Sequence, residues 1–278
     1  MNNFAQRTLS SVIYAGSVIF LTYFGEGIYS NLFGGVFAVL LLLALREFYT
    51  LLKAGRFQMI WSMVCGLCLY SAFWLQNTPV LSSIGAMLTV PYIFLLVVGL
   101  IVELWTKAEN PIANWGYLLI SQMMITLPFA LLVSLMGYNH WLVMALFVII
   151  WLNDAGAYCI GTLTAKLPGG NHKMFVRVSP KKSWEGLIGG IALAILTGYI
   201  ISLLNTDYST CLWLIMATLV AIAANLGDLM ESLFKRTIGV KDSGFFLPGH
   251  GGVLDRFDSL LLATPVLAGV VLFIELFS

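Results

Sequence analysis

The chain has 278 residues, of which 60% are hydrophobic and only 10% are charged, and its mean hydropathy is +0.93. Soluble domains contain about 25% charged residues, so this composition excludes an ordinary soluble protein and indicates an integral membrane protein. The net charge of +1 carries no sign of nucleic-acid binding, and we expect no nucleic-acid partner.

Apolar segments of about 20 residues predict an all-α, polytopic membrane protein with about nine transmembrane helices. We interpret the first as a retained signal anchor, because a second span follows at once and Gly25-Glu26-Gly27 is a poor cleavage site. We expect one membrane domain over residues 1–278, with generic helices in 1–140 and the functional residues in 141–278. The predicted spans are 9–25, 31–50, 59–76, 80–102, 114–136, 140–161, 184–204, 210–230 and 258–277.

These spans divide the charged residues unequally between the two sides of the membrane. All 14 Lys and Arg residues fall on the side that holds the N-terminus, and the other side receives only Glu26, Asp207 and Glu275. The positive-inside rule therefore predicts a cytoplasmic N-terminus and an exterior C-terminus. The longest loops, 162–183 and 231–257, fall on the basic side. We therefore expect a cell-membrane protein whose functional site faces the cytoplasm.

Cys65 and Cys68 form a C-x-x-C pair inside the third span. Such a pair could bind a metal or undergo redox chemistry, but the chain has no second pair to complete a zinc site. Packing by small apolar side chains in a membrane helix is the interpretation that we favour.

The densest group of charges begins at the end of the eighth span. Asp228, Glu231 and Ser232 stand at positions i, i+3 and i+4 of a helix, so they share a face that Lys235 continues, with Arg236 beside it. Carboxylates beside cations suit a phosphate group bound through Mg²⁺, which prefers one or two carboxylates together with phosphate oxygens. A solvated, self-paired helix end is the alternative.

A glycine-rich turn follows, with the sequence Pro248-Gly249-His250-Gly251-Gly252. Its backbone can approach a ligand closely, and Asp255 and Asp258 then stand at i and i+3 at the start of the last span, with Arg256 between them. A flexible glycine segment before a helix N-terminus is a natural anion site. For His250 alone, an ordinary loop histidine is the alternative.

Lys181 and Lys182 stand just before the predicted span 184–204. They could bind a phosphate or an anionic lipid headgroup, and Ser179 or Ser183 could cap the following helix. The alternative is a basic membrane anchor beside an interfacial tryptophan.

Asn153 and Asp154 form a polar patch inside an otherwise apolar span. Tyr158 shares the face of Asp154 one turn later. An ionisable residue within a membrane helix indicates a functional site.

These motifs together resemble the phosphatidate cytidylyltransferase (CDP-diglyceride synthase) family of prokaryotic type. The resemblance extends over residues 145–260, whereas 166–177 does not look like the family's usual link. The strongest similarity lies in Ser232-x-x-Lys235-Arg236, Lys241-Asp242-x-Gly244 and Leu247-Pro248-x-His250-Gly251-Gly252-x-x-Asp255-Arg256-x-Asp258. Gly227-Asp228-x-x-Glu231-Ser232, the block Ser179–Gly186 and Asn153-Asp154 are similar to the family in the same order.

The resemblance implies an enzyme that transfers the cytidylyl group of CTP to phosphatidic acid, giving CDP-diacylglycerol and pyrophosphate. It implies Mg²⁺ as the cofactor and leaves open a second, monovalent cation and a homodimer. As catalytic residues we expect Asp228, Lys235, Arg236, Asp255 and Arg256. As substrate-binding residues we expect Asn153, Asp154, Lys181, Lys182, Ser232, Lys241, Asp242, His250, Gly251 and Gly252. As metal ligands we expect Asp228 and Asp255, with Asp258 and Glu231 as lesser candidates.

Two other functions stay open from the sequence. A secondary transporter would also carry an intramembrane aspartate, but its key polar groups would lie near the midplane and open to both sides. The clustering of polar residues on one side favours an enzyme. A related enzyme that uses another lipid phosphate or another nucleotide is the second alternative.

Overall fold

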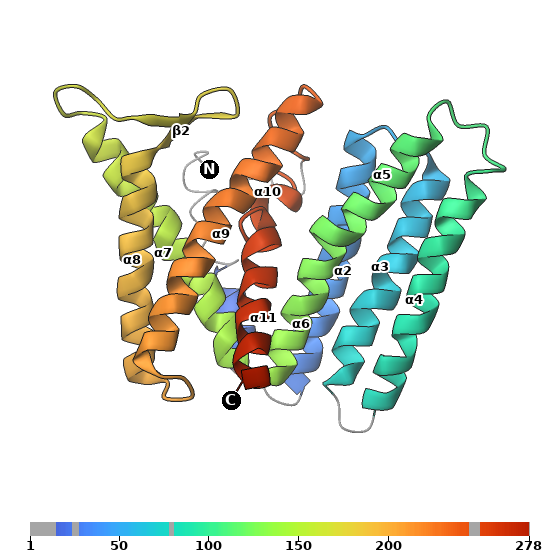
Figure 1. Cartoon of the computed structure of the whole chain (residues 1–278), viewed down its shortest axis with the longest axis horizontal. Helices are drawn as coiled ribbons and strands as arrows, with labels where there is room; N and C mark the ends of the chain where they lie inside the picture. The colour runs from blue at the N-terminus through green and yellow to red at the C-terminus, as the bar shows by residue number, and fades with distance from the viewer. Residues whose placement is uncertain (1–14, 24–27, 78–80, 245–250, 278) are drawn as a thin grey trace, which may run out of the picture. The chain divides into compact units, whose positions relative to one another are not determined.

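A computed structural model describes residues 15–23, 28–77, 81–244 and 251–277 (Figure 1). This part of the chain forms two compact units. The first comprises Met1–His140 and Asp242–Arg256, and the second comprises Trp141–Lys241 and Phe257–Ser278. The expectation of a single domain over 1–278 stays a prediction.

The first unit is a bundle of helices in which α3 packs against α2, α4 and α6. Aromatic side chains fill its core: Phe33 and Phe37 are stacked with ring centroids 4.2 Å apart, and Phe129 is fully buried beside them. A π-helix, η1, joins α5 to α6. The elements are α2 (Ile28–Leu51), α3 (Arg56–Gln76), α4 (Ser82–Val102), α5 (Pro111–Ser121), η1 (Gln122–Thr126) and α6 (Leu127–Tyr138).

The second unit is organised around α9, which packs against α8 on one side and α11 on the other. A two-stranded antiparallel hairpin, β1–β2, stands between α7 and α8 in the sequence. The elements are α7 (His140–Thr164), β1 (Lys173–Phe175), β2 (Ser179–Ser183), α8 (Trp184–Leu204), α9 (Thr210–Thr237) and α11 (Leu260–Phe277), with the short α10 (Leu254–Phe257) spanning the boundary of the two units in the sequence.

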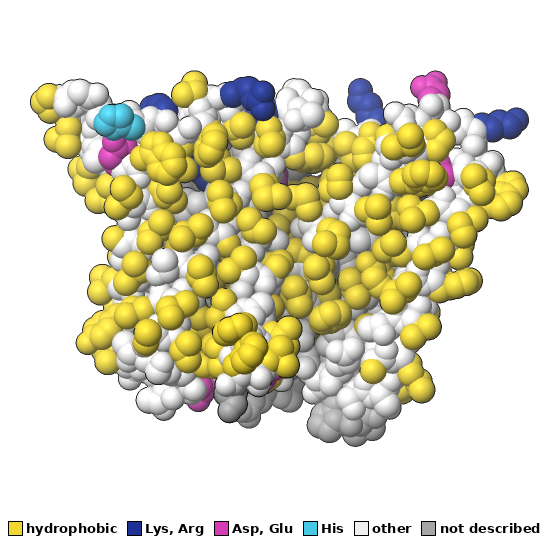
Figure 2. Space-filling model, in the orientation of Figure 1, with side chains coloured by type: hydrophobic (Ala, Val, Ile, Leu, Met, Phe, Trp, Pro, Cys, Tyr) yellow, Lys and Arg dark blue, Asp and Glu magenta, His cyan; other side chains and the backbone are white. Residues whose placement is uncertain are grey.

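The predicted class of fold is confirmed. Eight helices of the described residues are long and apolar enough to cross a membrane, and each corresponds to one predicted span. Residues 15–23 of the first predicted span are helical, and the rest of that span lies outside the described residues. Figure 2 shows hydrophobic side chains covering the flanks of the helices, while the visible Lys and Arg side chains gather near helix ends. The protein is therefore a multi-pass membrane protein.

Helix α9 continues to Thr237, past the end of the predicted span at 230, so the residues from Asp228 to Arg236 lie on a helix, as their spacing predicted. One detail differs from the prediction. The loop 162–183 contains the β-hairpin, which was not predicted.

All four cysteines are free. Cys68 donates to the carbonyl of Leu88 at 3.4 Å, as expected for a residue that packs within the helical bundle.

Candidate active site

The second unit contains a pocket of about 490 Å³. Its walls come from α7, the segment 162–174, β2, α8 and α9. Most of its polar lining residues carry charge or amide groups, in contrast to the apolar flanks of the same helices. The lining residues with charge or amide groups are Asp154, Asn171, Lys173, Lys181, Lys182, Asn225 and Asp228, and the hydroxyl groups come from Tyr158, Thr162 and Ser183.

A chain of polar contacts connects three elements of this pocket. Lys182 of β2 forms an ion pair with Asp228 of α9, with Nζ 2.7 Å from Oδ2, and donates to the carbonyl of Asn225 at 3.1 Å. The Asn225 amide donates to Oδ1 of Asn153 at 3.0 Å, and Asn153 donates to Oδ1 of Asp154 at 3.2 Å. Four of the predicted site residues (Asn153, Asp154, Lys182 and Asp228) are therefore brought together, with Asn225 as the connection.

The start of α8 fixes the position of the two lysines. Ser183 is the N-cap residue, and its Oγ accepts a hydrogen bond from the Gly186 N–H at 3.2 Å, which confirms one of the two predicted caps. Helix α8 then approaches α7 closely, because a Cβ at Gly190 would lie 2.7 Å from the backbone and side-chain oxygens of Asn153. Lys181 and Lys182 line the pocket directly before the N-terminus of α8.

The hairpin segment is anchored to α8 by Glu185. Its carboxylate accepts hydrogen bonds from the His172 N–H at 3.0 and 3.1 Å and contacts His172 Nδ1 at 2.6 Å. Asn171 donates to the carbonyl of Gly161 at 2.8 Å. These contacts hold Asn171 and Lys173 at the pocket, although neither residue was predicted to belong to the site. The only feature of the sequence that could have indicated these two residues was the polar and basic character of the loop 166–177, which did not resemble the family.

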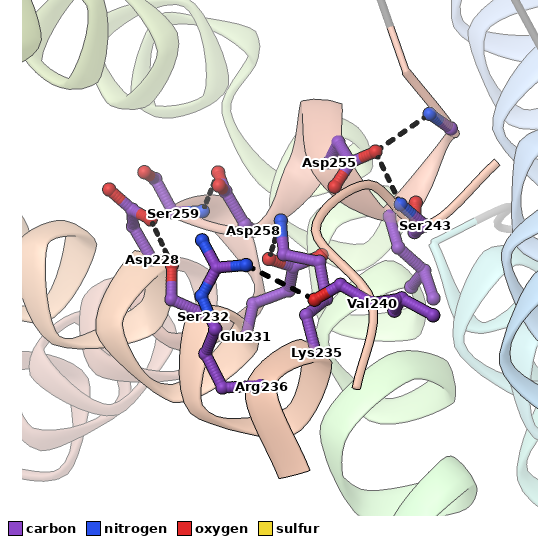
Figure 3. Close-up of polar contacts among 12 residues, drawn as sticks. Asp228, Glu231, Ser232, Lys235, Arg236, Val240, Ser243, Asp255, Asp258 and Ser259 are labelled. Atoms are coloured by element: carbon purple, nitrogen blue, oxygen red, sulfur yellow. Dashed lines mark hydrogen bonds and ion pairs between the residues drawn. The ribbon is translucent and has the colours of Figure 1, made fainter. Parts of the chain in front are cut away.

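A cluster of acids lies on α9 and at the turn before α11. Figure 3 shows Asp228, Ser232, Asp258 and Ser259 close together. Ser232 Oγ donates to Asp228 Oδ1 at 3.3 Å, and the Ser259 N–H donates to Asp258 Oδ1 at 2.6 Å. A Cβ at Gly227 would lie 2.6 Å from the carbonyl oxygen of Asp258, so glycine lets the two segments meet. This arrangement concentrates negative charge around Asp228.

The other charged residues of α9 have different surroundings. Glu231 and Lys235 are both buried and form an ion pair one helical turn apart. Arg236 is exposed and donates to the carbonyl of Val240 at 3.2 Å (Figure 3). Lys241 is exposed as well. The alternative of a self-paired helix end therefore describes Glu231 and Lys235, but not Asp228, whose cationic partner comes from β2.

Asp255 belongs to the first unit. Its Oδ2 accepts hydrogen bonds from the backbone N–H groups of Ser243 and Gly252, both at 2.8 Å (Figure 3). Gly251, at φ +76°, adopts the left-handed conformation that favours glycine. Arg256 and Asp242 are exposed. His250 lies outside the described residues, so its predicted role is not tested.

The carboxylates of the pocket suit a magnesium ion that is shared with a substrate. Among the residues that the structure describes, no three His, Cys, Asp or Glu side chains are arranged to hold a metal by themselves. Mg²⁺ in nucleotide sites is usually held by only one or two carboxylates together with phosphate oxygens. Asp228 with Asp154 or Asp258 supplies such hard oxygen donors, so the residues present fit this ion.

Comparison with known proteins gives consistent matches. The cytidylyltransferase family matches residues 5–274. A protein named phosphatidate cytidylyltransferase from Rickettsia bellii is 40% identical over 182 residues, which cover 62% of this chain and 75% of that protein. One of the same name from Staphylococcus saprophyticus is 42% identical over 130 residues, covering 46% of this chain and 47% of that protein. A third, from Rickettsia typhi, is 38% identical over 192 residues, covering 66% and 81%.

Proposed function

Because the chain belongs to the cytidylyltransferase family, we propose that it is a phosphatidate cytidylyltransferase. It transfers the cytidylyl group of CTP to phosphatidic acid and releases pyrophosphate, which gives CDP-diacylglycerol for phospholipid synthesis. The observation that carries this proposal is the pocket of the second unit, where Lys182 and Asp228 pair at 2.7 Å among helices that are apolar enough to cross a membrane.

Both substrates are anions, so the main tasks of the site are neutralisation and alignment of charge. Lys181, Lys182 and Lys173 line the pocket and supply the cations. A phosphate oxygen of phosphatidic acid attacks the α-phosphorus of CTP. The bond between this phosphorus and the oxygen that bridges the α- and β-phosphates breaks, and pyrophosphate leaves. The attacking phosphate monoester has a second pKa of about 6, so it is ionised near neutral pH without a general base.

Lys182 has a specific task in this scheme. In the described structure its ammonium group lies between the Asp228 carboxylate and the Asn225 carbonyl. A phosphate that enters the pocket competes with Asp228 for this cation, which frees a carboxylate oxygen at the moment when the substrate arrives. Asn153 and Asn225 hold Asp154 and Lys182 at fixed positions through their hydrogen bonds.

We propose Mg²⁺ as the cofactor, held by Asp228 with Asp258 or Asp154. The prediction that Asp255 is also a metal ligand rests on the sequence alone. When bound, the ion neutralises negative charge on the triphosphate. Glu231 is a weaker candidate because its carboxylate is already paired with Lys235. We also propose that the pocket faces the cytoplasm, which is supported by the position of every Lys and Arg on one side of the predicted topology.

The reaction is tested with purified protein, phosphatidic acid and CTP labelled at the α-phosphate. We expect label in the lipid fraction as CDP-diacylglycerol and an equal amount of pyrophosphate, both dependent on Mg²⁺. Competition with other nucleotides and other lipid phosphates separates this enzyme from related ones. Absence of lipid labelling, or labelling that does not need phosphatidic acid, would contradict the proposal.

A further inference from the structure

Glu47, near the C-terminal end of α2, contacts a segment about 200 residues later in the chain. Its Oε1 accepts a hydrogen bond from the Val253 N–H at 2.9 Å, and its Oε2 accepts one from the Leu254 N–H at 3.0 Å. Ser243 Oγ is 3.3 Å from Oε2. One carboxylate thus binds Ser243 and the backbone of Val253 and Leu254, and all of these residues belong to the first unit.

Two glycines make room for this carboxylate. A Cβ at Gly244 would lie 2.9 Å from Glu47 Oε1, and a Cβ at Gly252 would overlap with Oε2. Val253 and Leu254 are almost fully buried, so their N–H groups need partners within the protein. The side chain of Glu47 therefore explains the glycine at 244, and it explains the glycine at 252 together with the Ser243 hydroxyl, which also lies where a Cβ would stand.

Asp255 is held by the same short stretches of backbone. Its Oδ2 binds the N–H groups of Ser243 and Gly252, while Glu47 binds the Ser243 side chain and the N–H groups of the two residues after Gly252. The two carboxylates form a double clamp, in which Glu47 fixes the backbone that in turn fixes Asp255. Displacement of Glu47 would remove the hydrogen bonds that hold the Ser243 side chain and the Val253 and Leu254 N–H groups next to Asp255.

We propose that Glu47 is a positioning residue for this enzyme: it holds Ser243 and the backbone of Val253 and Leu254 so that the Asp255 carboxylate keeps one orientation. The inference rests on the proposed function and on the predicted role of Asp255. It gives a task to the N-terminal helices, which the sequence analysis treated as generic. Side chains that orient a reacting or metal-binding group typically contribute about 10- to 100-fold to activity or metal affinity.

The test compares Glu47→Gln with the wild type by hydrogen exchange and by activity. Glutamine keeps the size of the side chain but presents one NH₂ group, a donor, to a backbone N–H that is also a donor. We expect faster exchange of the amides of 243 and 252–254 and unchanged exchange in α3 and α9. We also expect a rate at saturating CTP that is lower on the order of 10-fold, with a higher Mg²⁺ concentration for half-maximal rate.

Glu109→Gln is the matched control, because Glu109 is an exposed glutamate of the same unit; it should behave as the wild type in both measurements. Wild-type exchange at 252–254 in Glu47→Gln, or local fast exchange with full activity, would overturn the inference. Faster exchange throughout the chain would also overturn it, because Glu47 would then act on global stability. If Glu47→Gln does not fold, Gly244→Ala disturbs the same carboxylate. A wild type without activity would instead contradict the proposed function.

Discussion

Lys182 is the cation that is tied most directly to the acids of the pocket. The Lys182 ammonium group pairs with Asp228 and also donates to Asn225. A neutral side chain therefore removes a positive charge from the proposed phosphate-binding pocket and the cation that pairs with Asp228. We expect Lys182→Gln to lower kcat/KM for CTP by roughly 100-fold, a typical loss for one group that stabilises developing charge. Steady-state kinetics on purified protein measure this.

Lys166→Gln is the matched control, since Lys166 is an exposed lysine of the same loop. It should change kcat/KM less than about twofold, because isolated surface charges contribute little. Equal losses in both variants would show that only the general positive charge of the loop matters.

At the residue scale, the sequence predicted those site residues that depend on local spacing. Asp228 and Ser232 share a helix face and are in contact, and Asp154 neighbours Asn153. The contacts between distant segments were not predictable, because one sequence carries no record of which loops meet. Glu47 lies in an apolar helix more than 190 residues from Ser243, and its role follows only from the fold.

Among the helices, the close contact between α7 and α8 positions two walls of the pocket. A methyl group at Gly190 would lie 2.7 Å from the backbone and side-chain oxygens of Asn153. We therefore expect Gly190→Ala to destabilise the protein by about 1–3 kcal/mol, as overpacking does, and to reduce activity through displacement of Asn153. Thermal unfolding in detergent and the activity of the folded fraction measure the two effects.

Gly269→Ala provides the comparison within the same unit. Gly269 lies in α11, and a Cβ there meets no atom within 4 Å. Alanine is favoured over glycine in a helix interior, so this variant should unfold no earlier than the wild type. A Gly190→Ala protein with wild-type stability and activity would show that the α7–α8 contact is not restrictive.

The helices were predictable because a membrane span needs about 20 apolar residues, and composition alone reveals such segments. The hairpin was not, since its strands Lys173–Phe175 and Ser179–Ser183 are short and the second is almost entirely polar. They are held by antiparallel pairing and by the contact of Glu185 with His172. Neither hydropathy nor local propensity reports such a contact, which explains why this wall of the pocket was missed.

The distribution of the basic residues predicts how the whole molecule is oriented in the membrane. In a variant without native cysteines, we expect Lys166→Cys to react with a membrane-impermeant maleimide only after the cells are opened. Thr206→Cys should react in intact cells, because the loop 205–209 lies on the opposite side in the predicted topology. Both positions are exposed in the described structure. The reverse labelling pattern would contradict a cytoplasmic site.

The two units of the molecule do not follow the order of the chain. The structure assigns Asp242–Arg256 to the unit of the N-terminal helices and the residues on both sides of this segment to the other unit. The reason is the set of hydrogen bonds from this segment to Glu47. A motif that is continuous in sequence is thus held by two separate sets of helices, which no spacing rule reveals.

If the pocket around Asp228 performs cytidylyl transfer, removal of the Asp228 charge must lower the rate of that transfer. The transfer of label from CTP to phosphatidic acid is compared for the wild type, Asp228→Asn and Glu109→Gln at equal amounts of folded protein. Asparagine keeps the shape of the side chain but removes the charge that pairs with Lys182. We predict a loss of at least about 100-fold for Asp228→Asn and a rate near that of the wild type for Glu109→Gln. Near-normal transfer by Asp228→Asn would contradict the account.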